Sequence, residues 1–273
     1  ISGLLGVVFA LGQHDLKRLL AYHSVENIGI IFMGLGVALI GRSAHRPEWV
    51  ALGLAGCLLH VWNHSFFKSL LFLCAGAVVH GAHTRQIDRM GGLARAMPWT
   101  AACFLIGAVA ICGLPPLNGF VSEWFVYLGL LKTAVSTERG GMGAMIGVPI
   151  LAMIGALAVA CFVKVYGTAF LGAPRTAAAG RAHEAPLSMR LPMAAFAACC
   201  VLIGLFPVAV VSSLDAATAC WAPPAPGLAA TRLGQIAPVG VISVLAVSLT
   251  LCAAGLALLL RRRSAAPRSG LTW

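Results

Sequence analysis

Long apolar blocks restrict what this chain can fold into. Five of them reach or exceed the ~20 residues that a helix needs to cross a bilayer, at residues 19–40, 50–79, 147–171, 192–214 and 236–260. Only 10% of the residues are charged, whereas soluble domains carry about 25%. A transmembrane barrel would instead show short alternating segments. The sequence therefore predicts an all-α fold, a polytopic bundle of transmembrane helices.

Positive charges flank these blocks and form no patch of their own. The net charge is +11, and the lysines and arginines lie mainly in short loops and near the C-terminal end. This distribution follows the positive-inside rule for membrane proteins. We therefore expect the lipid bilayer, and no nucleic acid, as the partner of this basic chain.

Nine cysteines are spread through the sequence, mostly in apolar segments, and none forms a C-x-x-C pair. Such pairs are typical of iron–sulfur and zinc sites. We therefore expect no metal site and no redox cofactor in this chain. The cysteines are interpreted as small buried residues.

A helix break is predicted within residues 98–133. Pro115 and Pro116 lack the backbone amide donor, and their rings clash with the preceding turn. Gly113 and Gly119 permit conformations that other residues avoid. One broken span places most loop lysines and arginines on one side of the membrane, whereas two spans would divide them evenly, so the positive-inside rule favours one discontinuous span. Transporters place such helices near the midplane, at an ion site.

The segment HVWNHSFFKSLLF, at residues 60–72, carries three ionisable side chains in an apolar span. His60, His64 and Lys68 are four residues apart, so on a helix they form one stripe about 12 Å long. A charge at the bilayer centre costs at least about 2.5–3.5 kcal/mol. The stripe is therefore expected to face other helices or water.

Three roles are open for this stripe. The side chains are structural if neighbouring helices satisfy them. Two histidines at i and i+4 have the spacing of metal ligands, but the glutamate of an H-E-x-x-H site is missing. We favour a proton relay, because histidine titrates near neutral pH and groups about 6 Å apart along a helix can exchange protons through one water.

Two more ionisable residues lie in apolar surroundings further along the chain. Glu123, four residues after Gly119, is a candidate proton carrier, and a satisfied buried acid is the alternative. Lys164 is either a relay site or a side chain that extends to the membrane interface.

The second span contributes further candidates. Lys17 lies at the beginning of this span beside Arg18, where interfacial anchoring is the alternative to a relay role. Glu26, with His23 close to it in sequence, either ends the relay or pairs with a buried cation.

At these residues the chain resembles a family of membrane subunits. The stretches that carry the resemblance are DLKRLLAYHSVENIGII, HVWNHSFFKSLLFLCAGAV, HTRQIDRMGGL and GLPPLNGFVSEWF. They are similar to the antiporter-like subunits of complex I, of multisubunit cation/proton antiporters and of membrane-bound hydrogenases. AHEAPLSMRLPM at residues 182–193 resembles the hydrogenase-4/formate hydrogenlyase branch. Glu26, where some relatives have serine, points to the same branch.

The resemblance implies a known architecture. The chain would hold the second of two inverted five-helix repeats, with one discontinuous helix and then extra C-terminal helices. It would divide into an antiporter-like domain at residues 1–171 and C-terminal helices with a basic tail at residues 172–273. Because the sequence begins with Ile1 and lacks a charged n-region, we expect a fragment of a longer protein without a signal peptide.

The resemblance also assigns roles to individual residues. Lys68 corresponds to the central buried lysine of the family, and His60 and His64 correspond to its relay histidines. Glu123 occupies the ionisable position of the broken helix, and Lys17 matches the lysine that links the two central groups.

The implied function is proton translocation within a hydrogenase-4/formate hydrogenlyase or complex-I-like oxidoreductase of the bacterial inner membrane. Other membrane and peripheral subunits would be the partners. Those partners, and not this chain, would carry iron–sulfur clusters and nickel–iron or flavin. Two alternatives stay open: a subunit of a multisubunit Na⁺/H⁺ antiporter without redox activity, and a membrane scaffold whose buried charges are inert.

Overall fold

The structure, a computed structural model, describes residues 1–136, 140–221 and 231–264. These residues form helices and no β-strand, apart from one isolated bridge between Asp15 and Gln86. Five of the helices are long and apolar enough to cross a membrane. The predicted fold class is therefore confirmed: the chain is an all-α, multi-pass membrane protein.

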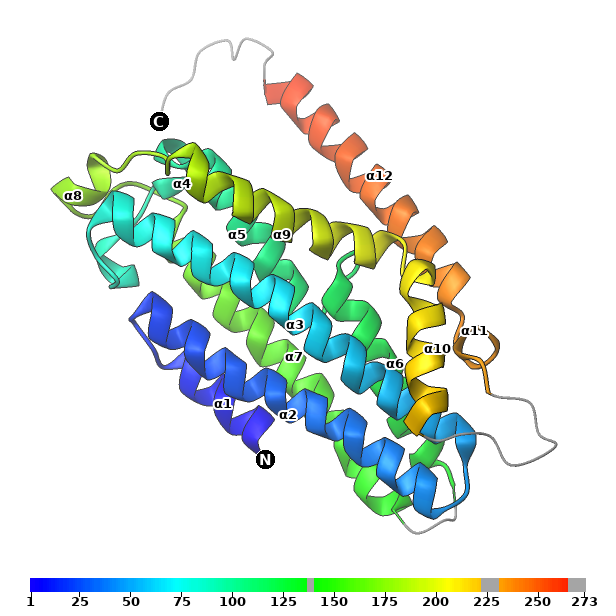
Figure 1. The fold of residues 1–273 in the computed structure, drawn as a ribbon. Coiled ribbons are helices and arrows are strands. Elements are labelled where there is room, and N and C mark those ends of the chain that lie inside the picture. Colours follow the sequence, from blue (N-terminus) through cyan, green and yellow to red (C-terminus); the bar gives the residue numbers. More distant parts are fainter. Residues whose placement is uncertain (137–139, 222–230, 265–273) are drawn as a thin grey trace.

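Nine helices form the body of the described structure. They are α1 (Ser2–Leu11), α2 (Leu16–Ser43), α3 (Pro47–Ala82), α5 (Pro98–Ile111), α6 (Asn118–Ala134), α7 (Gly141–Ala169), α9 (Leu187–Leu205), α10 (Val208–Trp221) and α12 (Val239–Ser264). Short turns of helix lie in the connections: η1 (Ile87–Arg89), α4 (Leu93–Ala96), α8 (Ala177–Gly180) and α11 (Leu233–Ile236). Figure 1 shows α3 crossing the bundle between α2 and α9.

Local sequence signals mark the beginnings of two long helices, α2 and α3. The Asp15 side chain accepts a hydrogen bond from the Arg18 amide at 2.9 Å and so caps the beginning of α2. Pro47 occupies the first turn of α3, where its missing amide costs nothing. Small residues then let α2 and α3 approach closely, since a Cβ atom on Gly53 would lie 2.6 Å from the Gly34 carbonyl oxygen. Such contacts between small residues favour helix association in lipid.

The discontinuity expected in residues 98–133 lies between α5 and α6. The segment between Ile111 and Asn118 contains both prolines, and Gly113 has a φ of 60°, in the left-handed region. The two halves still touch, because a Cβ atom on Gly119 would overlap the Ala110 carbonyl oxygen. Glycine is therefore required where α6 begins against the end of α5.

One predicted span was wrong. Residues 192–214 were expected to form a single helix, but α9 ends at Leu205 and α10 begins at Val208. Pro207 lies between them and provides no amide donor, and the residue before a proline is displaced from helical geometry. Phe206 accordingly has φ −125° and ψ 56°. Figure 1 shows α10 turning away from α9 at this point.

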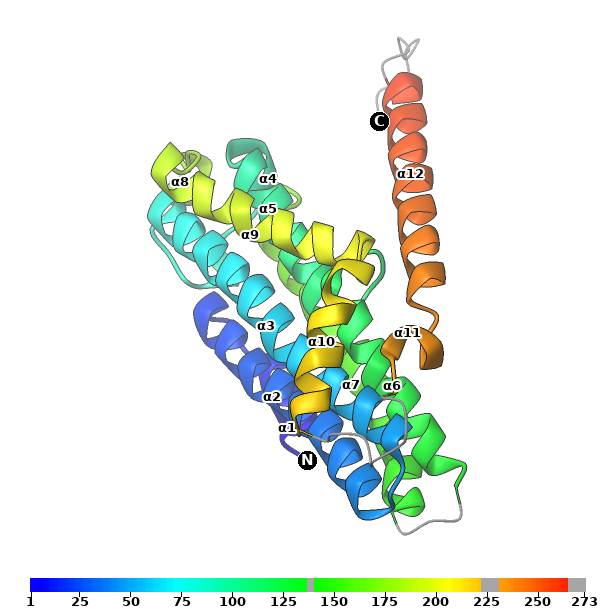
Figure 2. The same ribbon diagram turned by 45° about the vertical axis from the view of Figure 1, so that its right-hand side comes forward.

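The last helix lies apart from the bundle. Figure 2 shows α12 standing beside it, and α12 packs on α9, α10 and α11. The predicted basic tail extends into residues 265–273, which lie outside the described residues. The division predicted at residue 171, just beyond the end of α7, stays a prediction.

Candidate functional site

Two antiparallel helices place polar side chains opposite one another in the core. The α3 stripe contains His60 and Lys68. On α2, the Asn27 side chain is the hydrogen-bond partner of His60, and the Leu20 backbone oxygen is the partner of Lys68. From His60 to Lys68 the residue number rises along α3, while the number of the partner on α2 falls, as antiparallel packing requires. Residues 20, 23 and 27 are three and four apart and share one face of α2. The predicted stripe therefore faces protein and not lipid.

His60 occupies the junction of three helices. Its side chain is fully buried. Its Nε2 atom lies 3.0 Å from Asn27 Oδ1 on α2, and its Nδ1 atom lies 2.9 Å from Ser122 Oγ on α6. Asn27 in turn donates to the backbone oxygen of His23 at 2.7 Å. Both ring nitrogens are thus satisfied inside the bundle.

The polar contacts continue from His60 to the helix break. Asn63 Nδ2 donates to the Asn118 backbone oxygen at 2.8 Å and to Ser122 Oγ at 3.1 Å. Asn118 Nδ2 in turn donates a hydrogen bond to Asn63 Oδ1 at 3.1 Å. Because Asn118 and Ser122 lie in the first turns of α6, these bonds tie the second half of the broken helix to α3.

The Lys68 ammonium lies against α2. Its Nζ atom donates to the Leu20 backbone oxygen at 3.0 Å, and only 7% of the residue is exposed. Further along α2, Glu26 is hydrogen-bonded to His23 Nδ1, and both side chains are buried. α2 therefore carries a buried acid and its histidine partner within two turns of the backbone oxygen that Lys68 contacts.

His64 and Glu123 complete the group of buried ionisable residues. His64 lies between the other two members of the α3 stripe, and its buried Nε2 atom has no hydrogen-bond partner among the described residues. Glu123 lies one turn into α6 and is 7% exposed. Its carboxyl group lies against the backbone of Gly113, where a Cβ atom would come within 2.6 Å of Oε1. The acid is therefore held at the discontinuity.

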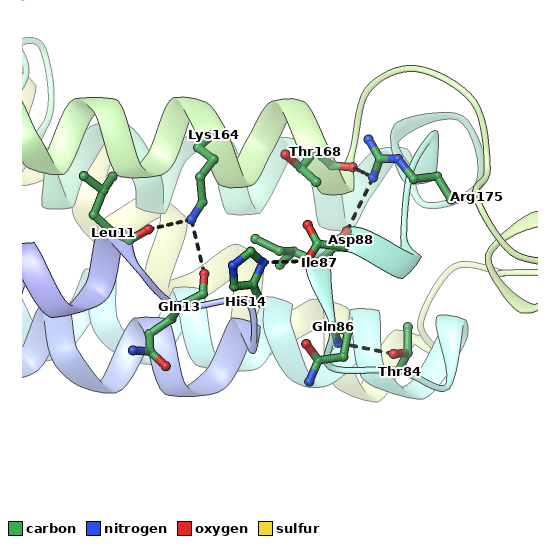
Figure 3. Close-up of polar contacts among 10 residues, drawn as sticks. All are labelled: Leu11, Gln13, His14, Thr84, Gln86, Ile87, Asp88, Lys164, Thr168 and Arg175. Atoms are coloured by element: carbon green, nitrogen blue, oxygen red, sulfur yellow. Dashed lines mark hydrogen bonds and ion pairs between the residues drawn. The ribbon is translucent and has the colours of Figure 1, made fainter.

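Two predicted relay residues lie away from this network, at the end of the bundle where α1 meets α2. Lys17 is half-buried in the first turn of α2. Lys164 on α7 donates from Nζ to the backbone oxygens of Leu11 at 2.7 Å and Gln13 at 3.2 Å (Figure 3). Its charge stabilises the carbonyl groups at the C-terminal end of α1.

The same end carries an exposed polar cluster on three connections. Figure 3 shows His14 pointing toward Asp88, and His14 Nδ1 lies 2.5 Å from Asp88 Oδ2. Arg175 donates to the Thr168 backbone oxygen at 2.7 Å and to the Ile87 backbone oxygen at 3.5 Å. These contacts join the α1–α2 turn, the loop after α3 and the loop after α7.

The sequence analysis did not single out three members of the network: Asn27, Asn118 and Ser122. A signal was present, since Asn27 and Ser122 are directly adjacent in sequence to Glu26 and Glu123, and Asn118 is four residues from Ser122. Within the described residues, no three histidine, cysteine, aspartate or glutamate side chains gather as metal ligands would.

The helices that carry this arrangement match a known protein family. The transmembrane family described as NADH:quinone oxidoreductase/Mrp antiporter matches residues 1–138. The matched region contains all of α1 to α6, and with them the α3 stripe and the broken helix. The chain belongs to this family.

Two curated relatives from Escherichia coli fall within the branch that the sequence suggested. Hydrogenase-4 component B is 50% identical over 209 residues, which are 75% of this chain and 31% of the relative. Formate hydrogenlyase subunit 3 is 46% identical over 207 residues, which are 75% of this chain and 34% of the relative. The resemblance to the hydrogenase branch is therefore confirmed. The chain spans about a third of the length of these two relatives.

Solved structures show the same fold. A chain of an archaeal membrane-bound sulfane sulfur reductase matches 99% of this chain with a TM-score of 0.73 and 21% identity, over 41% of its own length. A chain of respiratory complex I from Thermus thermophilus matches 81% of this chain with a TM-score of 0.64 and 23% identity, over 42% of its own length. At these identities the likeness concerns the fold alone.

Proposed function

We propose that this chain is part of a proton-translocating membrane subunit in a hydrogenase-4/formate hydrogenlyase or complex-I-like oxidoreductase of the bacterial inner membrane. The observation that carries the proposal is the series of buried hydrogen bonds from Asn27 through His60, Ser122 and Asn63 to the break at Asn118. The buried His23–Glu26 pair adjoins its α2 end, where Asn27 bonds the His23 backbone oxygen. Family membership and the two hydrogenase-branch relatives support it.

The proposed relay uses groups that can both accept and release a proton. Histidine changes charge near neutral pH, whereas the Asn27 amide and the Ser122 hydroxyl orient the His60 ring through hydrogen bonds and do not bind the proton. Loss of a proton changes the charge of Lys68 or of Glu26, and with it the electrostatic field at nearby buried groups. Glu123 stands at the far end of the path, beside the helix break. Lys17 and Lys164 are proposed as relay sites at the end of the bundle.

The partners are proposed from the same relatives. Other membrane subunits would complete the assembly, and peripheral subunits would carry iron–sulfur clusters with nickel–iron or flavin. Redox chemistry in those subunits would change the charge near Lys68 and drive the proton along the path. In this proposal the chain itself performs no redox step.

Substitutions in the full-length protein within its complex test the relay. Lys68→Ala and Glu123→Gln are expected to lower proton translocation by about tenfold or more, because each removes a group that takes up and releases the proton. Inverted vesicles energised with formate, hydrogen or NADH, with an acridine dye that reports the pH gradient, provide the measurement.

Lys132→Ala is the matched control, since its ammonium pairs with Glu48 at 2.7 Å on the surface. The control should assemble and translocate protons at the wild-type rate. Normal translocation by both relay variants, with reduced assembly, would support an inert scaffold and contradict the proposal.

A further inference from the structure

A carboxylate from a distant loop caps the first half of the broken helix. Met97, the N-cap residue of α5, provides no side-chain hydrogen bond. Glu184 Oε2 instead accepts from the Trp99 amide at 2.8 Å and the Thr100 amide at 3.2 Å, and its Oε1 accepts from the Thr100 hydroxyl at 2.5 Å. Free amides at a helix N-terminus favour an anion. The loop that leads into α9 therefore holds the beginning of α5.

The other end of α9 contacts the break itself. A Cβ atom on Gly204 would lie 2.6 Å from the Leu117 Cα atom and closer still to the Pro116 carbonyl oxygen. One turn earlier on the same helix, the Cys200 side chain is fully buried. The backbone of α9 therefore packs directly on the backbone of the segment between α5 and α6.

The lengths of the two helices fit this arrangement. α5 has 14 residues and α9 has 19, which correspond to about 21 Å and 28 Å at 1.5 Å per residue. α9 is therefore long enough to reach both the beginning of α5 and the segment after its end.

α9 is also fixed to the helix that carries the histidine stripe. The Cys74 thiol on α3 donates to Met193 Sδ at 3.4 Å, and the Phe66 and Phe196 rings pack with centroids 6.3 Å apart. The position of the break is consequently set relative to α3, and hence relative to His60 and Lys68.

We propose that residues 184–204, which we call the brace, hold the first half of the discontinuous helix at its beginning and at the break, and thereby set the distance between Glu123 and the α3 stripe. Glu184, Cys200 and Gly204 are positioning residues in this proposal, and none of them carries the proton. The inference rests on the proposed proton translocation and adds a residue-level account of what aligns its two helices.

Gly204→Ala tests the end of the brace at the break, in the full-length protein within its complex. The added methyl group must displace the backbone at residues 116–117, and a shift of about 1 Å in a reacting group costs up to a hundredfold in rate. We expect a complex that assembles and translocates protons about tenfold or more slowly than wild type. Gly240→Ala on α12 is the matched control, because nothing lies within 4 Å of its added Cβ atom.

Cys200→Ser provides a second test that adds no atoms. It replaces the buried thiol one turn before Gly204 with a more polar hydroxyl group, and Cys199→Ser is the adjacent control at a position with greater exposure. Glu184→Gln tests the cap of α5, with the surface residue Glu48 changed to Gln as its control. Cys200→Ser and Glu184→Gln are expected to slow translocation, and both controls are expected to leave it unchanged.

The double variant Gly204→Ala, Glu123→Gln separates positioning from general damage. If Gly204 acts through Glu123, the double variant is no slower than Glu123→Gln alone. Wild-type translocation by assembled Gly204→Ala would overturn the brace. If Gly204→Ala fails to assemble, equal rates for Cys200→Ser and Cys199→Ser would overturn it. Wild-type translocation by Glu123→Gln would instead refute the proposed relay.

Discussion

His60 is held on both ring nitrogens, by Asn27 on α2 and by Ser122 on α6. Burying a polar group in the membrane without a partner is costly, so these contacts stabilise the protein whatever its activity. They also fix the ring between the two helices that carry Glu26 and Glu123. In the proposed relay, a proton at His60 would therefore have polar neighbours on both sides.

Asn27→Leu is expected to destabilise the complex and to slow proton translocation. Leucine has a similar volume but leaves one His60 nitrogen without a partner, at a cost of about 1–3 kcal/mol. A lower thermal unfolding midpoint of the purified complex measures the loss. Ser65→Ala is the control, because the exposed Ser65 hydroxyl bonds only to the Trp62 backbone oxygen of its own helix. An unchanged midpoint for Asn27→Leu would contradict the assigned contact.

Gly113→Ala is expected to displace Glu123. Alanine at a φ of 60° is strained by about 1 kcal/mol, and its Cβ atom would enter the space of the Glu123 carboxyl group. Proton translocation should fall while Gly36→Ala, on α2 with nothing within 4 Å of the added atom, stays at the wild-type rate. Equal rates in the two variants would show that the position of Glu123 does not depend on Gly113.

At the scale of elements, the sequence predicted one helix interruption and missed another. The sequence predicted the break in residues 98–133, since two adjacent prolines cannot continue a helix. It did not predict the second interruption at Pro207, because the apolar block from 192 to 214 continues across it. Hydrophobicity reports burial in lipid and does not report helix continuity.

Lys164→Met is expected to weaken the contact between α7 and the C-terminal end of α1. The change keeps the apolar stem but removes the charged donor from the Leu11 and Gln13 oxygens, and hydrogen bonds to charged groups contribute about 1.5–3 kcal/mol. The thermal midpoint should fall, as measured on the purified complex. If the midpoint is unchanged and translocation is lost, Lys164 carries protons and its helix-end contact is secondary.

For the whole molecule, the chain spans about a third of the length of its two relatives from the hydrogenase branch. Some relatives belong to antiporters: one component of an Na⁺/H⁺ antiporter from Bacillus subtilis is 31% identical over 74% of this chain and 26% of its own length. The fold is shared by both classes. The other subunits of the complex are therefore the feature that distinguishes a hydrogenase from an antiporter.

Purification of the tagged full-length protein in mild detergent is expected to recover nickel–iron and iron–sulfur subunits, identified by mass spectrometry. The reason is the high identity to the hydrogenase branch. A sodium pulse given to energised vesicles should leave the pH gradient unchanged. Co-purification of small membrane proteins alone, together with a sodium-dependent loss of the gradient, would favour the antiporter.

The sequence by itself determined the all-α membrane fold, the break at Pro115 and Pro116, and the ionisable stripe of His60, His64 and Lys68. These follow from hydrophobic length, from proline geometry and from the helical repeat, which are local properties of the chain. Only the tertiary structure decided that Asn27 and Ser122 flank His60, that Lys164 lies at the end of α1, and that Glu184 and Gly204 hold the broken helix. Those contacts join residues far apart in sequence, so they depend on how the helices pack, which no local pattern specifies.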